Sequence, residues 1–110
     1  MSNAVRITWT GRVRPEQAEK YLAMHADPPA DLIAAMRAAH LDDYRIHRQG
    51  HVLFTTFTYT GDDWDADMAV FREIPICIEW GGLMIPMLEP MDDTGEVWVP
   101  AAPVFDLADW

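Results

Sequence analysis

The apolar residues of this chain change period from two to about 3.6 and back, and they do so twice along the sequence. Val5, Ile7 and Trp9 alternate with polar residues, which predicts a strand over residues 4–13 with one buried face. Pro15 then stands where a helix begins. The helical spacing that follows places four residues on one face: Ala18, Tyr21, Leu22 and His25.

After the first helix, the helical pattern resumes, and a hairpin, a second helical region and a last strand follow it. The prolines of residues 27–29 interrupt the first helix, and the helical pattern resumes over residues 32–39. A hairpin with Gly50 in its turn joins strands predicted from Tyr44 and over residues 52–59. A helix starting near Trp64, a break at Pro75, a short helical piece over residues 76–84 and a last strand over residues 96–99 complete the chain.

This order of elements, βαββαβ, is the ferredoxin-like order, so we expect an α+β fold with helices on one face of an antiparallel sheet. The 110 residues fit one domain spanning residues 1–110. In the third strand Val52 and Phe54 point to one face, and Phe57 and Tyr59 to the other. The face without helices is therefore expected to carry apolar groups, and to line a ligand cavity or meet a second subunit.

Charge and cysteine content exclude several classes of function. The net charge of −10 argues against nucleic acid and against an anionic membrane surface as partners. Cys77 is the one cysteine, so no internal disulfide forms, and a reducing, cytoplasmic location is expected. We predict no signal peptide and no membrane span, because the N-terminus lacks a basic start with an apolar run and all apolar runs are short.

Two residues on the first helix carry most of the chemical information. Tyr21 and His25 lie one helical turn apart on the apolar face, so a phenol and an imidazole point toward the sheet. Spacing alone favours a structural role, in which both are core residues with hydrogen-bond partners. The functional interpretation is a general acid/base histidine with a tyrosine beside it, suited to proton transfer near neutral pH.

Further candidates come from the aromatic and acidic residues. Tyr44 and Trp80 offer flat apolar rings with a polar tip, on which the C–H face of a sugar stacks, although core packing explains each equally well. Residues 63–74 imitate the start of a calcium loop but lack its glycine and its glutamate, so a capped helix start is predicted. His47 and His51 flank the hairpin turn without a third ligand, and we predict no metal site.

Several short patterns, in the same order and at similar spacing, resemble the L-rhamnose mutarotase family over nearly the whole chain. They are Y-x-x-x-H at residues 21–25, a strand tyrosine at Tyr44, L-F at residues 53–54, P-M-x-E-P at residues 86–90, G-E-x-W at residues 95–98 and V-F-x-L at residues 104–107. The resemblance implies an isomerase of carbohydrate metabolism with a ferredoxin-like, dimeric α/β-barrel type of fold. It implies a homodimer acting on a free 6-deoxyhexose such as L-rhamnose or L-fucose, with no cofactor and no metal.

The resemblance also assigns roles to residues. The proton-donating histidine of the family falls on His25, and its two sugar-contacting tyrosines fall on Tyr21 and Tyr44. Of the family's pair of wall tryptophans, this chain keeps Trp80 and has Gly81 at the second position. The family also has a tryptophan shortly after the first helix, and in this chain that stretch contains Pro29 and no tryptophan. These changes surround the expected sugar pocket, so they bear on which sugar binds more than on the reaction type.

Two other functions fit the same pattern. A cofactor-free or haem-handling oxygenase of the dimeric α/β-barrel type also uses a histidine and aromatic residues around an apolar cavity, and fold does not fix function. A non-catalytic dimer that binds a small molecule is the third possibility.

Overall fold

The computed structural model describes residues 4–110 and contains five strands and four α-helices. The strands are β1 (Val5–Val13), β2 (Leu41–Gln49), β3 (Val52–Tyr59), β4 (Leu88–Glu89) and β5 (Val99–Pro100). The helices are α1 (Ala18–Ala26), α2 (Ala30–Ala38), α3 (Trp64–Phe71) and α4 (Pro75–Met84). Short 3-10 turns cover Pro15–Gln17, Ile85–Met87 and Leu107–Asp109.

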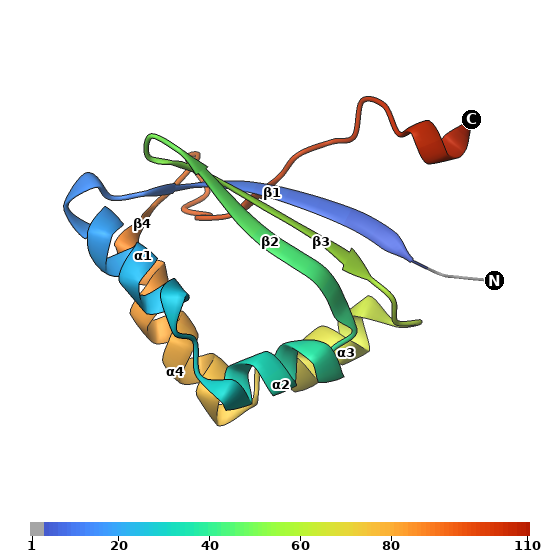
Figure 1. Ribbon diagram of the computed structural model, residues 1–110, viewed down its shortest axis with the longest axis horizontal. Helices are drawn as coiled ribbons and strands as arrows, with labels where there is room; N and C mark the ends of the chain where they lie inside the picture. Colours follow the sequence, from blue (N-terminus) through green and yellow to red (C-terminus); the bar gives the residue numbers. More distant parts are fainter. Residues whose placement is uncertain (1–3) are drawn as a thin grey trace.

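The strands form one antiparallel sheet in the order β2-β3-β1-β4, with β5 pairing with β1 beside β4. The helices lie on one side of this sheet (Figure 1). Helix α4 packs against α2 and meets α1 through the rings of His25 and Trp80. This is the arrangement expected of the βαββαβ order, and the α+β, ferredoxin-like prediction is confirmed.

The central strands divide their residues cleanly between two faces. Leu53, Thr55, Phe57 and Tyr59 of β3 are buried on the helical side, whereas the residues between them are only half-buried. The antiparallel register sets Trp9 of β1 directly opposite Thr55. The predicted division of the β3 residues is therefore correct, and the helix-facing surface is the one that forms a core.

The last strand was predicted over residues 96–99, and that prediction is wrong. Only Val99 of that range is in a strand, and it pairs with Thr10 as part of β5. The strand β4, which pairs with the end of β1, comes directly after the turn that follows α4. The edge of the sheet is shared by two strands of two residues each, which are too short to show a periodic pattern.

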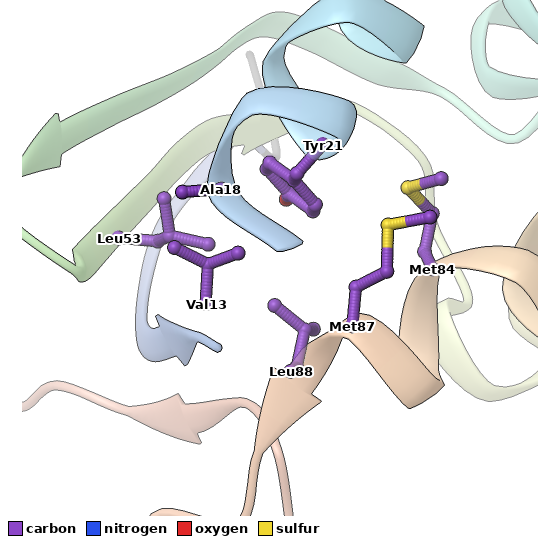
Figure 2. Packing of buried hydrophobic residues seen from close by; sticks show 7 residues of the cluster. All are labelled: Val13, Ala18, Tyr21, Leu53, Met84, Met87 and Leu88. Carbon is purple, nitrogen blue, oxygen red and sulfur yellow. The ribbon is translucent and has the colours of Figure 1, made fainter. Parts of the chain in front are cut away.

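The main hydrophobic cluster lies between β1, β3, α1 and the end of α4. Figure 2 shows Tyr21 of α1 among aliphatic and methionine side chains from the sheet and from the segment of residues 84–88. The cluster consists of Val13, Ala18, Tyr21, Leu53, Met84, Met87 and Leu88. Leu22 was expected on the buried face of α1, but its side chain is 47% exposed, because α1 contacts the core through a narrower stripe.

Gly11 makes room for an aromatic ring on the sheet. A Cβ atom at Gly11 would lie 2.9 Å from the ring of Trp98, which packs against the main cluster. Trp98 comes from the long loop before β5, so this contact holds that loop to the sheet.

Gly11→Ala is therefore expected to lower the free energy of unfolding by about 1–3 kcal/mol, because an added methyl group overpacks the contact. Gly82→Ala in α4 is the matched control, since a Cβ atom there meets nothing within 4 Å. Alanine in a helix is favoured over glycine by roughly 0.5–1 kcal/mol, so this variant gains stability. Urea denaturation of both variants checks the pair, and equal stability of the two would contradict the packing role of Gly11.

The chain beyond β5 leaves the body of the protein and ends in a 3-10 turn (Figure 1). Apolar side chains along this C-terminal arm, residues 101–110, are strongly exposed: Val104, Phe105, Leu107 and Trp110. In residues 4–110, no helix has both the length and the apolar character needed to cross a membrane.

Candidate active site

The end of α1 brings the imidazole of His25 against the ring of Tyr21. Nδ1 of His25 lies 2.7 Å from the carbonyl oxygen of Tyr21. Because a carbonyl only accepts, Nδ1 carries a proton and donates it to this bond, which leaves Nε2 as the nitrogen free for proton transfer. The two rings are 4.2 Å apart between centroids. The half-buried His25 is thus held in one orientation by its own helix.

Trp80 reaches the same place from α4. Its ring meets His25 edge to face, with the centroids 5.4 Å apart, and it also packs against the main hydrophobic cluster. Pro75 starts α4 at its first turn, which fixes where the helix begins and thereby the position of Trp80 one and a half turns later. Tyr21, His25 and Trp80 therefore form one contiguous group of rings.

A β-bulge in β2 turns Tyr44 toward the helices. The register shifts between Asp42 and Arg45, and Asp43 adopts a positive φ of 48°. The extra residue lets Leu41 and Tyr44 both face the helical side although they are three residues apart in the chain. Tyr44 then stacks on Phe57 of β3, with 5.2 Å between ring centroids and 19° between planes.

Burial keeps the phenols of this site in their neutral form. It raises the pKa of Tyr44 to about 12. The pKa of Tyr21 is raised first by burial and then by the nearby Tyr44, an interaction that links the two phenols across the site. At neutral pH both groups are therefore hydrogen-bond donors and acceptors without charge.

The raised pKa values predict that the tyrosines titrate at higher pH in the folded state than in the unfolded state. Burial and the hydrogen bond to Asp67 also raise the pKa of Tyr59 to about 12, so each of the three tyrosines titrates late. Unfolded tyrosines titrate near about pH 10. Because the folded state holds these protons more tightly, the stabilisation is full below about pH 10 and is lost as the pH rises toward 12.

Tyrosinate absorbance followed against pH, with and without denaturant, measures this difference. The folded protein is expected to show little tyrosinate at pH 10.5 (about half a unit above the free value), where the unfolded chain is mostly ionised. Superimposed titration curves would contradict the buried placement of the phenols.

Further aromatic rings surround the site on the sheet side. Phe57 contacts Trp9 at 5.1 Å and Trp64, the first residue of α3, at 6.0 Å between ring centroids. Phe57, Trp9 and Trp64 were not predicted from the sequence as site residues. The alternation of apolar and polar residues in β1 could have placed Trp9 on the buried face of the sheet. The position of Trp64 depends instead on how α3 packs against the sheet.

Two hollows lie along α4, and one of them is beside Trp80. A pocket of about 240 Å³ next to Trp80 is lined by Met24, Asp27, Pro29, Ile76, Glu79, Trp80 and Leu83. A larger groove of about 540 Å³ on the outer side of α4 is lined by Phe71, Arg72, Cys77, Ile78, Gly81, Gly82, Ile85 and Pro86. Of the predicted site residues, only Trp80 borders the smaller pocket, and Gly81 leaves open space where a side chain would stand.

The remaining candidates have structural roles or stand apart. The Asp63 side chain accepts a hydrogen bond from the backbone N–H of Ala66 and caps α3, as predicted. His47 is opposite Phe54 in the hairpin, so it does not pair with His51 across the turn. Within residues 4–110, no three His, Cys, Asp or Glu side chains gather closely enough to hold a metal ion.

The sequence is similar to proteins of one family. The family model described as L-rhamnose mutarotase matches residues 6–107. L-rhamnose mutarotases of Sinorhizobium fredii and Sinorhizobium medicae are each 29% identical to this chain. The alignments cover 88% and 87% of this chain, and 92% and 91% of those proteins.

Solved structures show the same fold. The crystal structure of an L-rhamnose mutarotase from Formosa agariphila superposes with a TM-score of 0.71 at 19% identity, over 94% of this chain and 98% of that one. A Caulobacter crescentus protein described as an antibiotic biosynthesis monooxygenase superposes with a TM-score of 0.61 at 14% identity, over 91% of this chain and 87% of that one. These structural likenesses show the fold, and the match to the family model shows the family. Because that match spans almost the whole chain, the protein belongs to the L-rhamnose mutarotase family of carbohydrate isomerases.

Proposed function

We propose that this protein interconverts the α and β anomers of a free 6-deoxyhexose such as L-rhamnose or L-fucose, with His25 as the proton donor. The observation that carries the assignment is the hydrogen bond from His25 Nδ1 to the Tyr21 carbonyl, beside the Tyr21 and Trp80 rings. It fixes the tautomer of a half-buried imidazole in an aromatic site, which is what proton transfer to a bound sugar requires.

The reaction needs two proton transfers and no change of oxidation state. On opening, the anomeric hydroxyl gives its proton to a water molecule, the bond between the anomeric carbon and the ring oxygen breaks, and the ring oxygen gains a proton from His25. The open aldehyde rotates about the bond to its neighbouring carbon. The hydroxyl that was the ring oxygen then attacks the other face of the carbonyl, loses its proton, and the carbonyl oxygen gains one.

In its doubly protonated form, His25 donates the proton on Nε2 to the ring oxygen on opening, and the neutral imidazole takes the proton back on closure. Tyr21 and Tyr44 stay neutral because burial raises the pKa of each phenol, so they hold sugar hydroxyls rather than remove protons. Trp80 offers a ring face for the C–H groups of the sugar.

At two positions of the family pattern this chain has a smaller residue in place of a tryptophan, which bears on the shape of the sugar that binds. Gly81 stands where the family has its second tryptophan, and the space at its Cβ position is empty for 4 Å. Pro29 lies in the stretch where the family has another tryptophan, and it borders the pocket beside Trp80. Pro29 lines the pocket beside Trp80, whereas Gly81 lines the groove on the outer side of α4, and we therefore propose the substrate as a class that includes L-fucose and L-rhamnose.

The experiment follows optical rotation after a pure anomer dissolves, with and without the protein, for L-rhamnose, L-fucose and D-glucose. We expect faster equilibration for a 6-deoxyhexose and little effect on D-glucose. Consumption of oxygen with a quinol, and no effect on any sugar, would favour the oxygenase instead.

We propose further that the protein works as a homodimer, and that it does so in the cytoplasm, where its one cysteine stays reduced. The support for a dimer is the C-terminal arm, on which Val104 is fully exposed and Phe105 is 68% exposed. Contiguous apolar groups in water favour association with another surface. The face of the sheet away from the helices carries the half-buried Val52 and Phe54 and offers a surface of the same character.

The double variant Phe105→Asp/Leu107→Asp is expected to be monomeric, because two charges on the arm prevent its burial. Light scattering after gel filtration should give about twice the chain mass of 12.5 kDa for the wild type and the single mass for the variant. Val70→Asp is the control, since Val70 is an exposed apolar residue of α3 outside the arm. A monomeric wild type would contradict the dimer.

A further inference from the structure

The pocket of about 240 Å³ beside Trp80 lies where the segment that joins α1 to α2 meets α4. Pockets that enclose drug-sized ligands have about 300–1,000 Å³, so this one matches a smaller molecule, of the size of one sugar ring. Most of the side chains that line it are apolar, which suits the C–H groups of a sugar. They are Met24 and Pro29 from the first segment, and Ile76, Trp80 and Leu83 from α4.

The pocket adjoins the candidate active site through both of its walls. The Trp80 ring lines the pocket and also meets His25 edge to face, with 5.4 Å between the ring centroids. On the other wall, His25 lies in the chain between Met24 and Asp27, which both line the pocket. A sugar that stacks on Trp80 from this pocket is therefore held at the border with His25.

Two carboxylates line the pocket, those of Asp27 and Glu79, and both are available to a ligand. Both residues are exposed, and within residues 4–110 neither side chain has a hydrogen bond or an ion pair. In the same part of the chain, no Lys, Arg or His lines the pocket with them. The polar part of this pocket thus consists mainly of acceptor groups, which suit a ligand that donates hydrogen bonds.

Helix stability does not explain where these two carboxylates stand. Asp27 is the C-cap of α1, and the negative end of a helix dipole disfavours an anionic side chain there. Glu79 lies inside α4, and the residues three and four positions away from it are all uncharged, so it forms no ion pair along its helix. Neither carboxylate stabilises its helix, and a role in binding accounts for their place in the pocket wall.

We propose that the sugar binds in this pocket and that the carboxylates of Asp27 and Glu79 accept hydrogen bonds from its hydroxyl groups. The inference rests on the proposed sugar-converting function and adds two substrate-binding residues to it. A carboxylate has two acceptor oxygens, so it takes hydrogen bonds from two neighbouring hydroxyl groups at once. Such charge-assisted bonds are roughly twice as strong as neutral ones.

The test compares Asp27→Asn and Glu79→Gln, singly and together, with Glu19→Gln and Glu73→Gln. Each substitution keeps the shape of the side chain and removes one negative charge. Glu19 of α1 and Glu73 before α4 are exposed acids that do not line the pocket, which makes them matched controls. For each full-length variant, the rate of anomer exchange against L-rhamnose concentration gives kcat and KM, and a titration of tryptophan fluorescence with the same sugar gives Kd.

We expect KM and Kd to rise about threefold to tenfold in each single pocket variant and further in the double variant, with little change in kcat. The two control variants should keep both constants near their wild-type values. Wild-type KM and Kd in the double variant would overturn the inference. An equal rise in the controls would also overturn it, because the cause would then be the net charge of the protein.

A second pair of variants tests the pocket itself. Leu83→Trp puts a large ring into the pocket, whereas Ile78→Trp puts one into the groove on the outer side of α4. Both side chains are exposed, at 44% and 60%, so both variants are expected to fold. KM should rise in Leu83→Trp alone, and a rise in neither variant or in both would contradict the placement of the sugar in this pocket.

The same measurements separate this inference from the proposed function. If the wild type converts the sugar and the double variant does so with the same KM, only the inference fails. If the wild type binds the sugar but accelerates no exchange, the function fails, and a raised Kd in the pocket variants still supports the inference. If the wild type neither binds nor converts any sugar, both proposals fall.

Discussion

His25→Asn lowers the protein-dependent rate of anomer exchange by about 10²- to 10⁴-fold, the range associated with loss of a general acid/base. Asparagine keeps an N–H group near the position of Nδ1, which lies 2.7 Å from the Tyr21 carbonyl oxygen, so the helix end is preserved. What is lost is Nε2, the only atom of the group that can exchange a proton with the sugar.

The matched control for this variant is His47→Asn. His47 is an exposed histidine of β2, placed opposite Phe54 on the face of the sheet away from the helices. Its replacement should leave kcat and KM unchanged. A folded His25→Asn protein with the wild-type exchange rate would remove His25 from the mechanism, whatever the outcome for sugar binding.

Trp80→Ala is expected to have the second largest effect, and it acts on binding and stability together. The half-buried ring contacts His25 at 5.4 Å between centroids and packs on the main cluster. Truncating a fully buried tryptophan to alanine lowers the free energy of unfolding by about 3–5 kcal/mol. Because the Trp80 ring is only half-buried, its truncation is expected to lower this free energy by about 2 kcal/mol. KM is expected to rise about tenfold, because the sugar loses its stacking partner.

Trp80→Phe distinguishes the two effects, since it keeps a ring of smaller area at the same place. It should recover most of the stability and part of the affinity, with kcat near the wild-type value in both variants. Urea denaturation gives the stability, and initial rates against L-rhamnose concentration give KM. A tenfold fall in kcat with unchanged KM would contradict the stacking role and assign the ring to the positioning of His25.

The fold was predictable because its elements have clear local signals. The alternation around Val5 and Trp9 marked β1, and the prolines of residues 27–29 and Pro75 marked the helix breaks that the structure contains. The two short strands were not predictable, because β4 and β5 owe their existence to pairing with β1, a contact made far along the chain. A segment of two residues has no period of its own.

The site was predictable only in part, for reasons that lie in its geometry. Tyr21 and His25 are close in sequence, so helical spacing alone places them together. The inward direction of Tyr44 depends on a bulge at Asp43, and a positive φ at an aspartate leaves no pattern in neighbouring residues.

The most direct test of the central claim is saturation transfer between the α and β anomeric proton signals of L-rhamnose at equilibrium. Transfer is expected to increase in proportion to added wild-type protein and to return to its value in buffer alone with His25→Asn. The same transfer with and without folded wild-type protein, for L-rhamnose and for L-fucose, would contradict anomer interconversion by this site.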